Sequence, residues 1–191
     1  MMTFHELVQK RRSVREFEDR SVPRPVIEKI IRESCMAPSA RNGQPWQFVV
    51  IDDGRLIQKL SDESKRNLIG ELEDEPGSPL KAYEAYLKDE KSHIFWNAPC
   101  LVYIGGSVNV ASLSVDCALA AAYFMFSASA RGLGTCWVAL GSRIKDPGIR
   151  REIGMPETFR IIAPVILGYP RRIPAPLPRR EPDIIWGSSG E

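Results

Sequence analysis

The sequence predicts one domain that combines helices with strands, and three observations support this fold class. The chain has 191 residues, which is long enough for one sizeable core and short for two. Four short apolar runs have the length and composition of strands, and segments with helical spacing of apolar residues separate them. Hydrophobic residues make up 43% of the chain and charged residues 26%, as in ordinary globular proteins. No internal repeat or linker divides residues 1–191, so we expect a single domain.

The N-terminal part predicts two helices and one strand. Thr3 and Glu6 form a capping-box pattern that begins the first helix. Pro25 suits the first turn of a second helix, whose predicted buried stripe consists of Ile27, Ile30, Ile31 and Ser34. The segment APSARNGQP (37–45) ends that helix because its prolines, glycine and asparagine disfavour helix. WQFVVID (46–52) follows as a strand, and its unbroken apolar run predicts that both faces are covered.

The middle of the chain is its most charged part and predicts further helices around one strand. Two groups of apolar residues there keep helical spacing: Leu56, Ile57 and Leu60, and later Leu80, Tyr83 and Leu87. EDEPGSP (73–79) between them predicts a loop, and PCLVYIGG (99–106) predicts a buried strand. Residues 111–134 predict a long helix that is apolar on nearly every face between Asp116 and Arg131. Such a helix packs against other elements all round or lies at a subunit interface.

The C-terminal part predicts two strands, a short helix and an extended tail. TCWVAL (135–140) and RIIAPVILGY (160–169) predict the strands, and Asp146 with Pro147 begins the short helix between them. The following tail is rich in proline and has no helical or strand period, yet it carries Ile184, Ile185 and Trp186. We expect this tail to dock on a partner subunit as an extended arm. A flexible tail is the alternative.

The overall charge of the chain does not favour any class of partner, but the placement of the basic residues indicates the kind of ligand. A net charge of +2 gives no global field that would favour nucleic acid. Arginines and lysines nevertheless gather near both ends: Lys10, Arg11, Arg12 and Arg15, and then Arg171, Arg172, Arg179 and Arg180. Local basic patches on a nearly neutral protein indicate a small anionic ligand rather than a polymer.

The number and spacing of the cysteines and histidines argue against a metal site and against a serine–histidine catalytic triad. The four cysteines, Cys35, Cys100, Cys117 and Cys136, form no Cys-x-x-Cys pair, and the chain has only two histidines. We therefore expect reduced, buried thiols and no metal site. The opening residues have too short an apolar run for a signal peptide, and the uncharged part of the long apolar helix, Cys117–Ala130, has 14 residues, fewer than a membrane span needs. These features predict a soluble cytoplasmic protein that does not enter a membrane.

Three short segments are candidates for ligand binding. RRSVR (11–15) lies at a helix end, where guanidinium groups, a serine hydroxyl and backbone amides could hold a phosphate. The loop within PSARNGQPW (38–46) offers Ser39, Asn42 and Gln44 to a heterocycle or a hydroxylated chain. The glycines of GLGTCW (132–137) allow the backbone to approach a flat ligand closely. Each segment alone is more often an ordinary surface or turn, and none is the dinucleotide-binding fingerprint.

Together these segments, with LGYP (167–170), resemble the nitroreductase family of FMN enzymes in their order and spacing. The resemblance spans essentially the whole chain, and RRSVR and PSARNGQPW are its most specific parts. It implies an α+β fold in which a mostly antiparallel sheet is wrapped by helices around a long central helix. It also implies an intertwined homodimer, in which the C-terminal arm (168–191) crosses to the other subunit and two FMN sites lie at the interface.

The resemblance assigns cofactor contacts to residues of four segments. Arg11 and Ser13 match phosphate-binding positions with Arg12 beside them, and Arg15 matches the cation under the flavin pyrimidine, where it would stabilise negative charge on the ring. The loop that the second subunit lends is matched by Pro38, Ser39, Ala40 and Asn42. The backbone near flavin N5 and O4 is matched by Val138, Ala139 and Leu140. Arg180 matches an arginine that returns to the phosphate. Pro178 departs from the family, which often has a basic residue there, and Arg179 is a candidate replacement.

The implied activity is electron transfer from NADH or NADPH through FMN to a small acceptor, such as a nitroaromatic or a quinone, by a ping-pong mechanism. The flavin itself would carry the chemistry, with no side chain as the catalytic group. Relatives with specialised flavin chemistry, reductive dehalogenation or flavin breakdown to a cobamide ligand, are an alternative, and residues 62–93 are the place for the lid that such chemistry needs. A non-catalytic module that grips nucleic acid with its basic ends is the remaining alternative.

Overall fold

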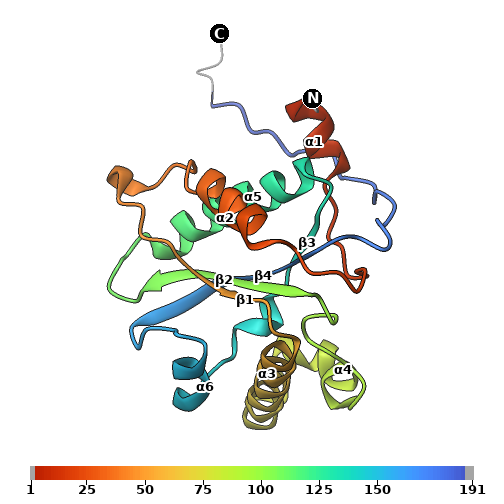
Figure 1. Cartoon of the computed structure of the whole chain (residues 1–191), viewed down its shortest axis with the longest axis vertical. Coiled ribbons are helices and arrows are strands. Elements are labelled where there is room, and N and C mark those ends of the chain that lie inside the picture. The colour runs from red at the N-terminus through yellow and green to blue at the C-terminus, as the bar shows by residue number, and fades with distance from the viewer. Residues whose placement is uncertain (1–2, 188–191) are drawn as a thin grey trace.

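A four-stranded antiparallel sheet organises the computed structural model, which describes residues 3–187 (Figure 1). Its strands are β1 (Gln47–Ile51), β2 (Cys100–Ser107), β3 (Gly134–Trp137) and β4 (Phe159–Gly168). They lie in the order β1-β2-β4-β3, so the long strands β2 and β4 are central and β1 and β3 are the edges. The predicted α+β class with an antiparallel sheet is therefore confirmed.

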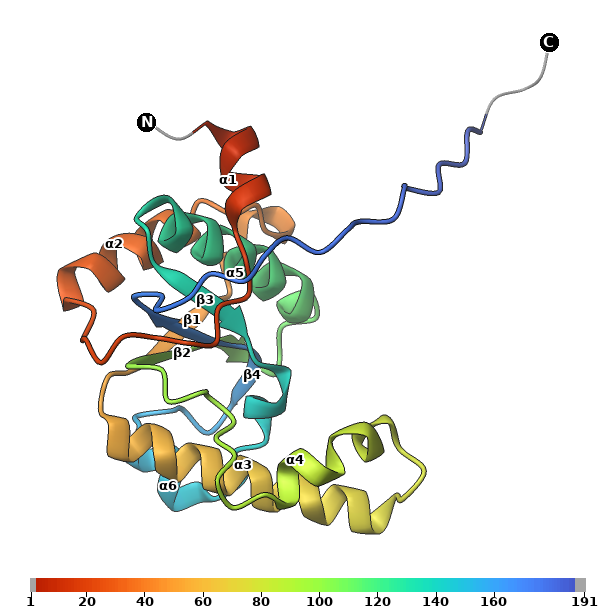
Figure 2. The same cartoon turned by 90° about the vertical axis from the view of Figure 1, so that its right-hand side faces the viewer.

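Helices cover both faces of the sheet. The helices are α1 (Phe4–Lys10), α2 (Arg24–Ser34), α3 (Gly54–Asp74), α4 (Glu84–Lys88), α5 (Leu113–Ala130) and α6 (Pro147–Glu152), with short 3-10 helices η1 (Ala40–Asn42), η2 (Pro79–Tyr83) and η3 (Ala139–Ser142). On one face α2 lies beside α5, and α1 stands against the end of α5 (Figures 1 and 2). On the other face lie α3, α4 and α6.

The core under α5 is built from small and aromatic side chains. Cys117, Ala120, Ala121 and Phe124 of α5 are buried together with apolar residues of β2 and β4. Small alanines let the helix approach the sheet closely, which agrees with the predicted central helix. By length and composition alone α5 could cross a membrane, but its inner side is buried against the sheet and α2, as in the core helix of a soluble protein.

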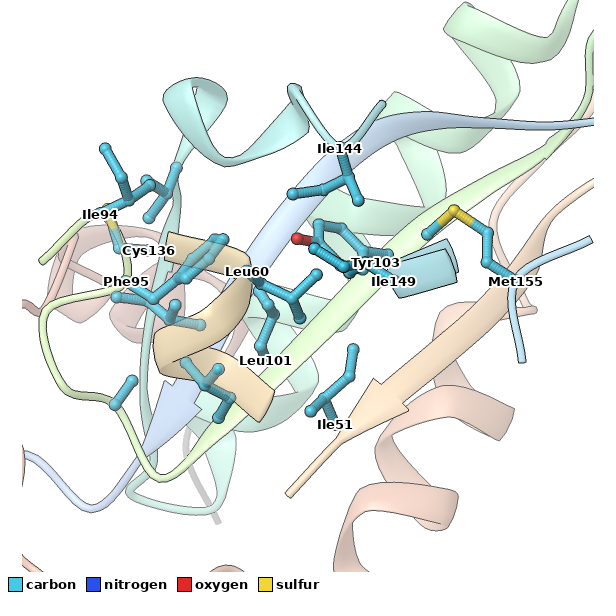
Figure 3. Close-up of a cluster of buried hydrophobic side chains, with 14 of the residues drawn as sticks. Ile51, Leu60, Ile94, Phe95, Leu101, Tyr103, Cys136, Ile144, Ile149 and Met155 are labelled. Carbon is cyan, nitrogen blue, oxygen red and sulfur yellow. The ribbon is translucent and has the colours of Figure 1, made fainter. Parts of the chain in front are cut away.

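The core on the other face fills the space between the sheet and α3. Leu60 of α3 and Leu101 and Tyr103 of β2 pack with Phe95, which precedes β2 (Figure 3). The rings of Phe95 and Tyr103 meet edge to face at 6.3 Å between centroids. This packing fixes α3 and the segment that leads into β2 against the sheet, and both border the candidate site described below.

Three helix ends follow the sequence signals. Thr3 and Glu6 form the predicted capping box of α1. The Asp146 carboxylate accepts a hydrogen bond from the Ile149 amide at 2.8 Å, as expected for the N-cap of α6. Gly132, just after α5, has a left-handed φ of 74° that favours glycine at a helix end.

Three sequence-based expectations were wrong. The strand β1, at the edge of the sheet, is not covered on both faces, since Val50 is 39% exposed. The third strand ends at Trp137, and the predicted strand residues 138–140 turn into η3 instead. The predicted helix around residues 80–87 is split into η2 and α4, which follow a long α3.

Candidate functional site

The arginine segment that follows α1 runs alongside the edge strand β3. Ser13 forms a parallel bridge with Thr135, and the Val14 amide donates to the Thr135 carbonyl at 2.9 Å. The two backbones approach so closely that a Cβ on Gly134 would lie 2.8 Å from the Val14 side chain. Glycine is therefore required here for close approach, and it holds residues 11–15 against β3.

A cavity of about 1240 Å³ opens between the end of α1, the arginine segment and the C-terminal arm. Its polar lining includes Arg11, Ser13, Arg15 and Arg179. Its apolar lining includes Val8 of α1 and Leu177 of the arm. The lining of the cavity is thus partly cationic and partly apolar. Segments from opposite ends of the chain contribute to it.

Arg11 is half-buried, whereas Arg15 and Arg179 are exposed. Burial lowers the pKa of the Arg11 guanidinium from the ordinary value, and the nearby charges of Arg12 and Arg179 act in the same direction. Within residues 3–187, no carboxylate forms an ion pair with Arg11, Arg15 or Arg179. A half-buried arginine that is repelled by neighbouring arginines is stabilised by an anionic ligand, and phosphate suits the paired N–H groups of guanidinium.

The two remaining predicted arginines differ in their relation to the cavity. Arg12 also lines it, but its guanidinium donates to the backbone carbonyls of Gln9 and Arg11 and so serves the C-terminal end of α1. Arg180 is exposed and does not line the cavity, whereas its neighbour Arg179 does. Arg179 is the arm residue that faces Arg11, which fits its suggested replacement of the basic residue absent at Pro178.

Arg15 lies against an aromatic pair that the sequence did not single out. Its guanidinium stands 5.6 Å from the ring centroid of Trp96, which stacks on Tyr86 at 5.7 Å. Trp96 and Asn97 both have left-handed backbones, with φ of 55° and 51°, so the turn that presents the indole is strained. The contact orients Arg15 by a cation–π interaction.

The turn after β3 lies next to the arginine segment, as the family pattern implied. The Val138 amide donates to the Pro164 carbonyl at 2.8 Å, and Ala139 and Leu140 begin η3. Ser64 of α3 donates to the Leu140 carbonyl at 2.5 Å. The structure thus brings residues 138–140 and the arginine segment to the same edge of the sheet (Figure 2).

The fourth predicted segment lies apart from the other three. Pro38, Ser39, Ala40 and Asn42 lie in the loop between α2 and β1, and no residue of that loop lines the cationic cavity. Figure 1 shows this orange loop and the red arginine segment on opposite sides of the molecule. One chain by itself therefore does not bring all the predicted cofactor residues together.

Metal and thiol chemistry find no support in the part of the chain that the structure describes. No group of three or more histidine, cysteine or acidic side chains there could hold a metal ion. Cys100, Cys117 and Cys136 are buried, and Cys35 is half-buried. Burial raises the pKa of the Cys136 thiol, which lies close to Arg15 and Ser13. That thiol is held in its protonated form and behaves as a packing residue.

Comparison with known proteins agrees with this geometry. The chain is 28% identical over 183 residues to the "Putative NADH dehydrogenase/NAD(P)H nitroreductase" of Methanothermobacter thermautotrophicus, covering 94% of this chain and 84% of the relative. It is also 28% identical over 190 residues to iodotyrosine deiodinase 1 of Mus musculus, covering 88% of this chain and 62% of the relative. The structure of a nitroreductase with bound FMN from Bacteroides fragilis superposes with a TM-score of 0.77 at 24% identity, covering 98% and 97% of the two chains. The model of the nitroreductase family matches residues 8–169, which is most of the chain, so the protein belongs to this family of oxidoreductases.

Proposed function

We propose that this protein binds FMN and passes electrons from NADH or NADPH to a small acceptor, such as a nitroaromatic or a quinone, in a ping-pong cycle. The observation that carries the proposal is the cavity at Arg11, Ser13 and Arg179, whose cations have no carboxylate partner among the described residues. Membership of the nitroreductase family supports it, as does the similarity to an FMN-bound nitroreductase structure.

The donor set of the cavity fits a phosphate monoester. Arg11 is held half-buried, Ser13 supplies a hydroxyl and Arg179 approaches from the arm. Guanidinium groups bind phosphate oxygens in pairs, and charge neutralisation would relieve the repulsion between the arginines. The phosphate end of FMN would bind here, with the arm covering it.

The other residues of the site act on the ring end of the cofactor. FMN, when bound, supplies the hydride and electron transfer. Arg15 would place a positive charge near the pyrimidine edge and stabilise the negative charge that develops there. The backbone of residues 138–140, which Ser64 and Pro164 hold, would fix the position of the ring. Leu140 packs against the core and would exclude water from that side.

A homodimer would complete the site. The loop that carries Ser39 and Asn42 lies far from the arginine segment of its own chain, so it would serve the site of the other subunit. Exposed apolar side chains lie on three elements: Phe4 and Val8 on α1, Val115, Leu119 and Tyr123 on α5, and Ile173, Leu177, Ile184, Ile185 and Trp186 on the arm. Uncovered large apolar groups of this number are typical of a subunit interface. Residues 188–191 of the expected arm lie outside the described residues.

The test is cofactor uptake by the purified protein and by matched arginine variants. We expect a yellow protein with one FMN per chain, bleached anaerobically by NADH or NADPH. Arg11→Ala should lower the FMN affinity at least about tenfold because it removes charged hydrogen bonds to phosphate. Arg15→Ala should chiefly slow flavin reduction and shift the reduction potential.

The control is Arg55→Ala, because the Arg55 side chain is 96% exposed on α3 and, among the described residues, its one ion pair is with Asp53 at 3.8 Å. It should bind FMN as the wild type does. A colourless wild-type protein that takes up no added FMN would contradict the proposed function. Full affinity and full reduction rate in both Arg11→Ala and Arg15→Ala would overturn their assigned roles.

Reductive dehalogenation is the second candidate, because the chain aligns with iodotyrosine deiodinase over 88% of its length. The two activities differ in product. We expect reduced protein to convert a nitroaromatic or quinone and to release no iodide from iodotyrosine. Rapid iodide release, with little turnover of nitroaromatics, would favour the deiodinase function instead.

A further inference from the structure

Asp116 is a buried carboxylate inside an otherwise uncharged helix. It is the only Asp, Glu, Lys or Arg in α5, and its side chain is 3% exposed. Burying a carboxylate is costly unless hydrogen bonds satisfy it. The rest of the inner face of α5 is packed with apolar side chains, and Asp116 lies in the first turn, where the helix dipole favours a negative charge.

The two oxygens of Asp116 connect α5 to the loop between α2 and β1. Oδ1 accepts from the Ala40 amide at 3.1 Å, and Oδ2 accepts from the Ser112 hydroxyl at 2.7 Å. Ser112 comes just before α5, so one oxygen holds the carboxylate and the other holds the loop. Figure 1 shows the loop, in orange, next to the N-terminal end of α5, in green.

The loop needs such an anchor because its backbone is strained. Arg41, Asn42 and Gln44 all have left-handed φ values, of 52°, 54° and 45°, and none is glycine. Inside the loop, the Gln44 amide donates to the Ser39 hydroxyl at 3.0 Å. Within residues 3–187, residues 38–44 form only one hydrogen bond that involves a side chain and reaches another element. It is the bond from the Ala40 amide to the Asp116 carboxylate.

We propose that Asp116 is a positioning residue that holds the 38–44 loop in the strained shape in which it binds FMN. This inference rests on the proposed function, in which Ser39, Ala40 and Asn42 contact the cofactor of the partner subunit. Without Asp116 the left-handed residues would relax, and the loop would no longer present its polar groups as a fixed set. Asp116 would not touch the cofactor itself.

The matched pair Asp116→Ala and Asp116→Asn tests this role. Alanine leaves the Ala40 amide without its acceptor, whereas asparagine can still accept from Ala40 and can donate to Ser112. We expect Asp116→Ala to raise the FMN dissociation constant at least about tenfold and Asp116→Asn to stay close to wild type. Asp52→Ala is the control, because it removes an exposed carboxylate that pairs with Arg24 at the surface, and it should not change FMN affinity.

Limited trypsin digestion of the apoprotein tests the anchor without the cofactor. Arg41 lies in the loop, and the wild-type and Asp116→Asn proteins should be cut slowly after it. Asp116→Ala should be cut several times faster. If wild-type protein bound no FMN, the proposed function would fail, while the digestion would still decide whether Asp116 holds the loop.

Two outcomes would overturn the inference. One is wild-type FMN affinity and wild-type cleavage in Asp116→Ala. The other is an equal loss in the Ala and Asn variants, which would mean that the negative charge acts rather than the hydrogen bonds. If Asp116→Ala does not fold, Ala40→Pro removes the same hydrogen bond from the loop side, at the first position of η1, where proline is tolerated. Unchanged affinity in that variant would refute the proposal.

Discussion

At the scale of single residues, His93 shows how burial sets a protonation state. The imidazole is buried, and its Nδ1 accepts a hydrogen bond from the Phe95 amide at 3.0 Å, which requires the unprotonated nitrogen. Burial lowers the pKa of His93 from its ordinary value of 6.5. The side chain is therefore held neutral next to the strained turn that carries Trp96.

The first prediction concerns the pH dependence of stability. Near and below its ordinary pKa, His93 binds more protons in the unfolded chain than in the folded one, so protonation favours unfolding. The free energy of unfolding should fall as the pH is lowered from about 7.5 to about 5.5. His93→Gln, which keeps an acceptor for Phe95, should reduce that slope in urea denaturation. His5→Gln, at an exposed position, should leave it unchanged, and an unaltered slope in His93→Gln would contradict the assignment.

At the residue level, the sequence could predict which residues lie together where they belong to one short motif, and their role in binding a cofactor stays a prediction. The pattern RRSVR placed Arg11, Ser13 and Arg15 in one site region, because the backbone of residues 11–15 runs along β3. The pattern alone could not show that Arg12 turns back to the carbonyls at the end of α1. The contact of Trp96 with Arg15 depends on two segments 81 positions apart, and no local signal reports it.

At the scale of elements, the close contact between β3 and the arginine segment requires a residue without a side chain at position 134, and this requirement can be tested. A Cβ there would meet Val14 at 2.8 Å, and both residues are buried. Gly134→Ala should lower the free energy of unfolding by about 1–3 kcal/mol, because the segment must move away from the strand. It should also weaken FMN binding, since Arg11 and Ser13 move with the segment.

Gly70→Ala is the matched control for this substitution. Gly70 lies inside α3, and nothing lies within 4 Å of an added Cβ. Alanine should stabilise the helix by about 0.5–1 kcal/mol, because it loses less backbone entropy than glycine. Thermal or urea unfolding of the two variants should therefore shift in opposite directions. A stabilised Gly134→Ala protein would show that the contact can relax freely.

The type of an element could be predicted where a long apolar segment indicates a helix. The position of a strand in the sheet, which depends on the topology, was harder to predict. The apolar composition of α5 predicted a central helix, and its contacts with α2 and with β2, β3 and β4 confirm it. For β1, an unbroken apolar run could not distinguish a central strand from an edge strand whose outer residues meet solvent. For residues 138–140, the pairing of β3 with β4 ends where Trp137 meets Val165, and the next residue of β4, Pro164, has no N–H to donate. The local sequence of residues 138–140 does not show this.

At the scale of the whole molecule, the C-terminal arm has little contact with its own chain beyond its first residues. The Arg171 amide donates to the Glu16 carbonyl at 2.9 Å, and Arg172 pairs with Glu16 at 3.5 Å. Beyond that point all described arm residues are exposed, and Trp186 is 82% exposed. In a lone chain this arrangement leaves large apolar groups in water, and an interface with a second copy would bury them.

Ending the chain at Arg172 tests the proposed role of the arm. Sedimentation equilibrium should show a dimer for the full chain and mainly monomer for the truncated one, with FMN retention lost. The full-length variant Arg179→Ala separates charge from packing. It should stay dimeric and bind FMN more weakly, because it removes only the guanidinium that faces Arg11. A truncated protein that remained a fully loaded dimer would refute this role.

The distance between the arginine segment and the 38–44 loop has a genetic consequence. In the proposed dimer each site takes its phosphate ligands from one chain and its loop from the other. A mixed dimer of an Arg11→Ala chain with an Asp116→Ala chain would place both defects in one site and leave the other site intact. Two copies of the gene that are each inactive alone would then complement each other, and a cell that carries both would regain activity.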